Sequence, residues 1–168
     1  MPQANNLLSH LLSRLLTCAL LASAAAGPVA AQEGPQPKLP TVQLTAGMHV
    51  IQAEIAATPM QQQIGMMMRR EMGANEGMLF VNAEPGVRCF WMRNTLIPLS
   101  AAFVGDDGTI VNIADMQPQT DDSHCSTKPV RFVLEMRQGW FDKRGIKAGF
   151  KLSGPPFAPA RAAVSPPR

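Results

Sequence analysis

Residues 100–113 read SAAFVGDDGTIVNI, and this stretch decides the fold class. Two short runs of strand-forming residues, 100–104 and 109–113, flank the turn sequence from Gly105 to Gly108. Apolar runs separated by Gly and Asp are typical of a β-hairpin, because these residues accept the backbone angles of a tight turn. We therefore predict a hairpin here, and similar short patterns on both sides of it favour a mainly β domain.

Upstream of this hairpin, the sequence predicts a second hairpin and a short helix. Residues 41–45 alternate between apolar and polar, and residues 50–57 continue as a second strand after a glycine turn. The sequence TPMQ that begins at Thr58 is a capping-box pattern. A short helix is therefore expected from Pro59 to near Gly65.

Residues 88–92 read RCFWM and are apolar on both faces of a predicted strand. Cys89 and Trp91 would point one way, and Phe90 and Met92 the other. Such a strand belongs in the middle of a sandwich or barrel. The other predicted elements are strands at 77–81, 130–136 and 146–152 and one or two helical turns at 138–144.

Length and composition fit one such domain. The chain has 168 residues, of which 46% are hydrophobic and 16% charged. It is too apolar for a disordered chain and too short for two full cores. We predict, over residues 41–152, a single β-sandwich or closed β-roll of about seven or eight short strands with one or two short helices. The net charge of +3 at pH 7 is too small to indicate a nucleic-acid partner.

The N-terminus has the pattern of a secretory signal peptide. Arg14 precedes an apolar run, and Ala31 completes a Val-Ala-Ala sequence of the kind that signal peptidase cleaves. Residues 1–31 are therefore predicted to be removed, which makes the protein periplasmic or secreted. No later segment is apolar enough over a sufficient length to span a membrane. The Pro-rich segments 32–40 and 153–168 are predicted to be flexible.

Two cysteines remain in the predicted mature chain, Cys89 and Cys125. In an oxidising compartment the simplest interpretation is a disulfide between them. A zinc site that joins these cysteines to His49 and His124 is an alternative, although no CxxC or HxxxH spacing supports it. A copper(I) site built on His124 and nearby thioethers is another, against plain core packing of the methionines Met66, Met67, Met68 and Met72.

A candidate ligand surface lies around Trp91. The Trp91 ring offers a flat apolar face, while Asn94, Thr95 and Arg69 offer polar groups of the kind that orient a ligand. The alternative is that Trp91 belongs to the core and that Asn94 and Thr95 only turn the chain. The candidate ligand-binding residues are Arg69, Trp91, Asn94, Thr95 and His124.

Several motifs occur in an order that is similar to one family. They are GMMMR (65–69), EGMLF (76–80), FWMRNTLIPL (90–99), DGTIV (107–111), VLE (133–135) and GIKAG (145–149). Through them the chain resembles, over residues 50–152, the bacterial and archaeal family called "domain of unknown function 192". The resemblance implies a small, mainly β domain that is often exported. It implies no reaction.

The sequence thus favours an exported, non-enzymatic domain that binds a small molecule or an envelope component. Two alternatives stay open. One is a hydrolase-like envelope enzyme that uses His124 with the acidic loop of Asp121 and Asp122. The other is a periplasmic copper(I)-handling protein. No catalytic residue, metal or cofactor is assigned.

Overall fold

The structure, a computed structural model, describes residues 34–157. The predicted signal peptide, residues 1–31, lies outside the described residues, as do residues 158–168 of the predicted C-terminal segment. The described part of the chain contains eight strands, one α-helix and two short 3₁₀ helices. Within it, no helix combines the length and the apolar character that a membrane crossing requires.

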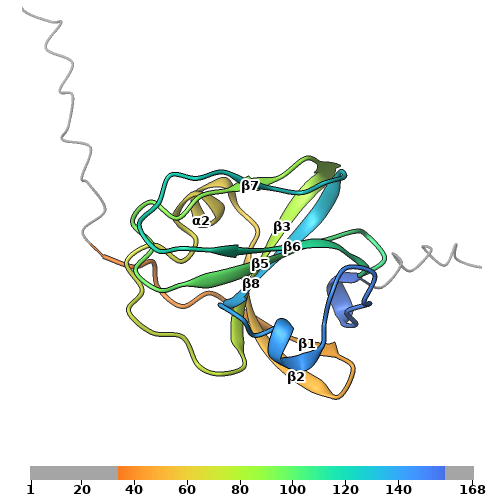
Figure 1. Ribbon diagram of the computed structural model, residues 1–168. Helices are drawn as coiled ribbons and strands as arrows, with labels where there is room; N and C mark the ends of the chain where they lie inside the picture. Colours follow the sequence, from red (N-terminus) through yellow and green to blue (C-terminus); the bar gives the residue numbers. More distant parts are fainter. Residues whose placement is uncertain (1–33, 158–168) are drawn as a thin grey trace, which may run out of the picture. The chain divides into compact units, whose positions relative to one another are not determined.

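Six of the strands form one sheet (Figure 1). In order across the sheet they are β1 (Thr41–Ala46), β2 (His49–Ala56), β3 (Glu76–Gly86), β8 (Val130–Arg137), β5 (Leu99–Val104) and β6 (Ile110–Met116). Neighbouring strands are antiparallel except β2 and β3, which are parallel. A parallel pair needs a crossover connection, and this one contains the helix α2 (Pro59–Ile64). The β1–β2 and β5–β6 pairs confirm the two predicted hairpins.

The mainly β class is confirmed, but the predicted closed β-roll is wrong because the sheet is open. β1 and β6 occupy its two ends and do not pair with each other. The remaining strands of the described chain, β4 (Cys89–Phe90) and β7 (His124–Cys125), form a separate two-stranded sheet. The second layer is therefore made mostly of loops and one helix, and not of a second large sheet.

The predicted strand at 146–152 is also wrong. This part of the chain makes only isolated bridges, from Lys151 to Thr109 next to β6 and from Ser153 to Thr45 in β1. Gly149 turns the chain with a φ of +86°, an angle that favours glycine. The segment therefore divides its hydrogen bonds between the two ends of the sheet instead of pairing along one strand.

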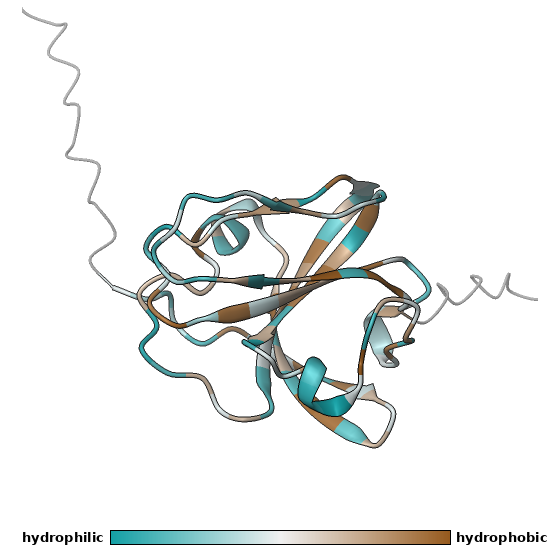
Figure 2. Ribbon diagram, viewed as in Figure 1, coloured by the Kyte–Doolittle hydropathy of each residue, from teal (hydrophilic) through white to brown (hydrophobic). Residues whose placement is uncertain are grey.

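The sheet is buried on both faces. All six residues of β5 are buried, and they alternate between two core clusters, with Ala102 and Val104 on one face and Ala101 and Phe103 on the other. The chain after β8, including Trp140, packs in the first cluster, and the turn after α2 contributes Met66 and Met72 to the second. Figure 2 shows hydrophobic segments along the strands of this sheet. Any polar side chain on either central face must therefore be paired or must face a cavity.

The strand predicted at 88–92 is shorter than expected and lies outside the large sheet. Only Cys89 and Phe90 are extended, and they pair with β7. Asn94 has a φ of +60° and the Thr95 amide donates to the Met92 carbonyl, so the chain turns directly after β4. The strand alternation ends there, which leaves Trp91 45% exposed instead of in the middle of a sandwich. The central strands are β3, β8 and β5.

The predicted disulfide is confirmed: Cys89 and Cys125 are opposite each other in the β4–β7 pair and are bonded. Their sequence separation is 36 residues, and closing a loop of this length stabilises the folded chain by about 4 kcal/mol in the chain-entropy model. The bond therefore ties β4 to β7 and to the polar loop that precedes β7. Phe90 of β4 packs against the second core cluster.

The helix α2 has the predicted start. The Thr58 side chain accepts from the Gln61 amide, and the Gln61 side chain accepts from the Thr58 amide, which is a complete capping box. Gln36, which precedes the predicted domain, is buried and donates to the carbonyls of Gln61 and Gly65. At the other end of the described residues, Phe157 is also buried. The packed domain thus extends beyond residues 41–152 on both sides.

Candidate functional site

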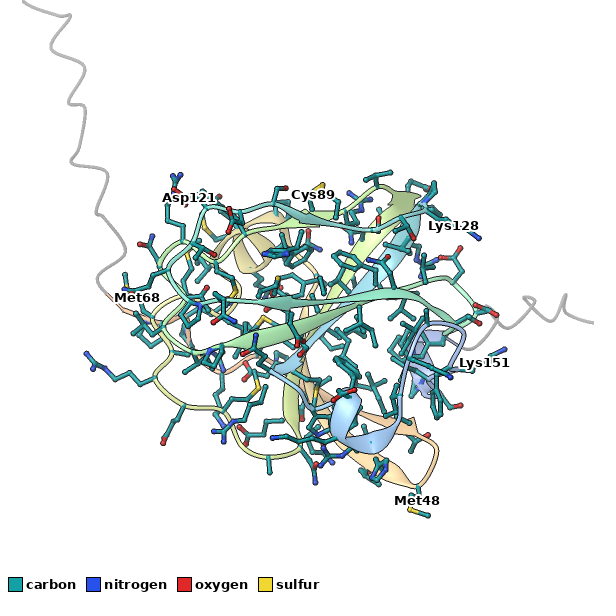
Figure 3. The ribbon with its side chains drawn as sticks, in the orientation of Figure 1. Met48, Met68, Cys89, Asp121, Lys128 and Lys151 are labelled. Carbon is teal, nitrogen blue, oxygen red and sulfur yellow. A yellow bond between two sulfur atoms is a disulfide. The ribbon has the colours of Figure 1, made fainter. Side chains whose placement is uncertain are left out.

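A cleft of about 470 Å³ opens over the face of the sheet that carries the second core cluster, between α2 and the segment around β4. It is lined by polar, aromatic and sulfur-containing side chains from four parts of the chain. One of them, Cys89, is labelled in Figure 3. The lining includes Gln62, Met66, Phe80, Asn82, Val87, Arg88, Cys89, Phe90, Trp91, Thr95 and Glu135.

The strand register places Glu135 on this face of the sheet. Its direct neighbours across the sheet are Met78 of β3 and Ala101 of β5. Directly opposed residues point to the same side, and Met78 and Ala101 belong to the second core cluster. Glu135 is therefore a carboxyl between two apolar neighbours in its row. The small side chain of Ala101 leaves room beside it.

The Glu135 carboxyl is buried without a partner. The residue is 4% exposed, and its Oε2 atom makes no hydrogen bond to any described residue. Loss of hydration disfavours the charged form, and no nearby cation compensates. Burial thus raises the pKa of Glu135 from 4.5 to about 8. At neutral pH the free protein holds this carboxyl mostly protonated.

Charged side chains near Glu135 are engaged elsewhere. Arg88, which lines the same cleft, donates from Nη2 to the Glu84 carbonyl, and its buried Nε makes no hydrogen bond to any described residue. On β8 itself, Arg131 pairs with Asp106 and Arg137 donates to the Met72 carbonyl. None of the ion pairs between described residues includes Glu135.

Aromatic rings form one wall of the cleft. Phe80 and Phe90 meet edge to face with their ring centroids 4.8 Å apart, and Phe90 also contacts Phe103. Gly65 makes this packing feasible: a Cβ atom there would lie 3.1 Å from the Phe80 ring, and the φ of +49° favours glycine. The turn after α2 therefore closes directly onto the aromatic wall.

The rim of the cleft is unusually apolar for a surface. Val87 is 61% exposed and Trp91 is 45% exposed, and both line the cleft. The Arg93 guanidinium lies 4.2 Å from the centre of the Trp91 ring, and its Nε donates to Asp121 at 2.7 Å. The Arg93 guanidinium thus contacts the Trp91 ring at the mouth of the cleft while it pairs with Asp121.

The structure brings two of the five predicted ligand-binding residues to the cleft. Trp91 and Thr95 line it, and Thr95 is buried. Asn94, Arg69 and His124 are not among its lining residues. Asn94 is exposed and its carbonyl accepts from the Met68 amide, while His124 sits in β7 opposite Phe90.

Arg69 forms a buried ion pair with Glu54 and lines a second, adjacent cavity of about 390 Å³. Its Nη2 donates to Glu54 Oε2 at 2.8 Å, and Nη1 donates to Oε1. The Leu39 amide donates to the same carboxylate. Burial alone would raise the pKa of Glu54, but the hydrogen bonds from Arg69 and Leu39 and the charge of Arg69 lower it overall.

The methionines considered for copper are divided between core and surface turn. Met66 and Met72 are buried in the second core cluster, and Met67 and Met68 are partly exposed. Within residues 34–157, no group of three or more His, Cys, Asp or Glu side chains is arranged to hold a metal ion.

Sequence reasoning missed Glu135. Strand alternation in β8 puts it on the same side as Arg131 and Arg137, and such a side is normally in solvent. The signal that could have found it is Val133, an apolar residue on the same side of the strand. That pattern fits a strand whose centre is buried on both faces, with Glu135 near the middle.

Comparison with known proteins gives a family and two similar folds. The family model for DUF192, described as "Uncharacterized ACR", matches residues 42–154. A crystal structure from Novosphingobium aromaticivorans, described as a protein of unknown function, is 38% identical with a TM-score of 0.66; the match covers 74% of this chain and 94% of that one. No curated protein matches the chain.

The second solved structure comes from Sinorhizobium meliloti and is described as "a putative transcription regulator". It is 33% identical, with a TM-score of 0.67, and the match covers 71% of this chain and 97% of that one. The described domain is therefore similar to nearly the full length of both structures.

The pairing of Glu54 with Arg69 predicts that Arg69→Met is strongly destabilising. The substitution leaves a buried carboxylate without its cation, which should lower the free energy of unfolding by about 3–5 kcal/mol. The double variant Glu54→Gln, Arg69→Met removes both charges and should regain most of the loss. Urea unfolding at pH 7 measures both. Equal loss in the single and double variants would contradict the interpretation of Arg69 as the counter-ion of Glu54.

The uncompensated burial of Glu135 predicts an unusual pH dependence of stability. Its folded-state pKa of about 8 exceeds the unfolded value of 4.5, so the folded state binds more protons between these values and stability falls as pH rises through that window. Glu135→Gln removes this loss. At about 1.4 kcal/mol per pKa unit, the variant should gain roughly 4 kcal/mol over the wild type between pH 4.5 and pH 8.

Unfolding by urea across this pH range tests the expectation. Glu84→Gln, which neutralises an exposed carboxylate, is the matched control and should follow the wild type. Parallel pH profiles for the wild type and Glu135→Gln would show that the carboxyl ionises normally in the folded protein.

Proposed function

We propose that this chain, which belongs to the DUF192 family, binds a small organic molecule in the cleft above Glu135. The observation that carries the proposal is a nearly fully buried carboxyl with an unpartnered oxygen in the lining of a cleft of about 470 Å³. Ligand sites combine this kind of mostly apolar wall with a few polar groups that fix orientation.

The energetics favour a role in binding over a role in stability. An apolar residue at this position would fit the row of Met78 and Ala101 without loss of hydration. The carboxyl instead makes the free protein less stable at neutral pH. Groups that are unfavourable for folding and lie in a cleft are typical of functional sites.

The rim supports the same proposal. Exposed Val87 and Trp91 present apolar surface at the mouth, where a ligand would cover it. The disulfide between Cys89 and Cys125 anchors this part of the cleft to the loop before β7. The wall that contains Trp91 is thus held in place before a ligand arrives.

We also propose that the protein acts outside the cytoplasm, in the periplasm or secreted. The support is the signal-peptide pattern of residues 1–31, together with a disulfide of the kind that persists in oxidising compartments. The ligand is then a molecule that is present in the envelope or outside the cell.

The binding proposal is tested by nuclear magnetic resonance with three compounds that share a phenyl body. They are 2-phenylethylamine, 3-phenylpropionamide and 3-phenylpropionate, added at millimolar concentration to the exported protein. At least one should shift the backbone amide signals of Gly65, Phe90 and Thr95, and should leave those of Asp106 and Lys151 unchanged. Absence of such shifts for all three compounds would overturn the proposal.

A pair of variants checks the position of the ligand. Trp91→Ala removes an aromatic face from the mouth and should weaken binding by about five- to tenfold. Met48→Ala removes an exposed apolar side chain from the β1–β2 hairpin, which does not line the cleft, and should change the affinity less than twofold. Equal effects of the two variants would mean that the compounds bind non-specifically.

A further inference from the structure

We infer that the occupant of the cleft is an organic amine, bound as an ammonium ion whose charged head sits against the Glu135 carboxylate and whose apolar body lies along Phe80, Phe90 and Trp91. The inference rests on the proposed function, since it names the chemical class that the cleft takes. Two carboxylates on the same face of the same sheet, Glu54 and Glu135, are paired differently.

Glu54 and Glu135 lie in one row across the sheet. Both are neighbours of Met78 in the register, one from β2 and the other from β8, so their strands are about 10 Å apart. Both residues are less than a tenth exposed. The two carboxyls are thus buried on the same face, and they differ in their hydrogen-bond and ion-pair partners.

The fold supplies a cation for one carboxylate and not for the other. Glu54 receives both terminal nitrogens of Arg69 and the amide of Leu39. Glu135 receives no hydrogen bond at Oε2 and no ion pair from any described residue. Glu54 thus shows that a carboxylate on this face is held with a cation. Glu135 lines a cleft through which a ligand can supply one.

The polar lining of the cleft favours a ligand that donates hydrogen bonds. Gln62 donates from its side-chain nitrogen to the carbonyls of Ala56 and Val81, so its two amide hydrogens are used and its side-chain oxygen remains to accept. The Thr95 hydroxyl has an acceptor oxygen as well. An ammonium group has three donors and no acceptor, which matches a carboxylate and neutral oxygens.

The apolar lining favours a cation with an organic body. Aromatic rings attract ammonium groups through the ring quadrupole, and the rings of Phe80, Phe90 and Trp91 line the cleft. Arg88, the cationic side chain of the lining, is held at the turn around Gly86: its Nη2 donates to the Glu84 carbonyl, and a Cβ on Gly86 would lie 3.3 Å from that nitrogen. A hydrated inorganic cation would gain nothing from these walls.

Binding of the amine changes the protonation of Glu135 and makes no covalent bond. The free protein holds the neutral carboxyl, and the ligand arrives as an ammonium ion. On binding, the carboxyl gives its proton to the buffer and the carboxylate pairs with the ammonium. One proton is therefore released per ligand below the pKa of Glu135, which is about 8, and none well above it.

Isothermal titration calorimetry with the same three phenyl compounds tests the inference. We expect 2-phenylethylamine to bind at least tenfold more tightly than 3-phenylpropionamide or 3-phenylpropionate. Its affinity should rise about tenfold from pH 6 to pH 7 and level off above about pH 8, as the release of one proton requires. Titrations of the wild-type protein in buffers of different ionisation enthalpy measure the number of protons that are released per ligand bound.

Two variants at matched charge separate a direct contact from a general electrostatic effect. Glu135→Gln should weaken amine binding at least tenfold and abolish its pH dependence between pH 6 and pH 8. Glu84→Gln removes an exposed negative charge that does not line the cleft and should keep the affinity within twofold. Because the proton count needs no variant, the test stands even where Glu135→Gln folds poorly.

The outcomes distinguish the two proposals. If 3-phenylpropionamide or 3-phenylpropionate binds in the cleft more tightly than the amine, with an affinity that falls above about pH 8, the inference of an amine ligand is overturned. The proposal of a ligand site in the cleft then remains. Amine binding without proton release would place the ammonium away from Glu135 and would also overturn the inference. Failure of all three compounds to bind would overturn the proposed function itself.

Discussion

Burial of the central sheet on both faces is the constraint on which the rest of the structure depends. Strand β5 has no exposed residue. Its neighbour β8 is buried at six of its eight positions, with Arg131 partly buried and Arg137 exposed, so an inward polar group at its centre has no access to bulk water. Such a group is tolerated only with a partner or beside a cavity. This rule explains both the ion pair of Glu54 with Arg69 and the location of the cleft over Glu135.

The layer that covers this face is held by local interactions more than by a second large sheet. The capping box at Thr58 starts α2, Gln36 bonds to its C-terminal carbonyls, and the disulfide fixes β4 against β7. These contacts hold α2 and β4, two of the segments that line the cleft. The carboxyl of Glu135, which is costly to bury, lies in the same lining.

Much of the fold could be predicted from local sequence. Both hairpins and the helix start at Thr58 depend on residues that act within a few positions. The disulfide depends on the one cysteine pairing in the predicted mature chain. All are present in the described residues. The errors arose where tertiary contacts override a local pattern. The apolar residues after Cys89 suggested a central strand, but the backbone turn at Asn94 takes them out of the sheet.

The candidate site was predicted only in part, for a related reason. Trp91 and Thr95 stand out as residue types that contact ligands, and both line the cleft. Glu135 does not stand out, because a carboxylate flanked in alternation by Arg131 and Arg137 has the pattern of a solvated strand face. Val133 is the apolar residue on that side of the strand. The register with Met78 and Ala101 shows that this side of β8 is covered, and register is a property of the assembled sheet.

The most direct measurement of the central claim is a carbon-13 nuclear magnetic resonance titration of the Glu135 side-chain carboxyl in the free protein, assigned by comparison with Glu135→Gln. The account predicts a midpoint near pH 8, far above the ordinary value of 4.5, because the buried carboxyl lacks a cation until a ligand supplies one. A midpoint near 4.5 would mean that the carboxyl is already hydrated or paired, and would contradict the account.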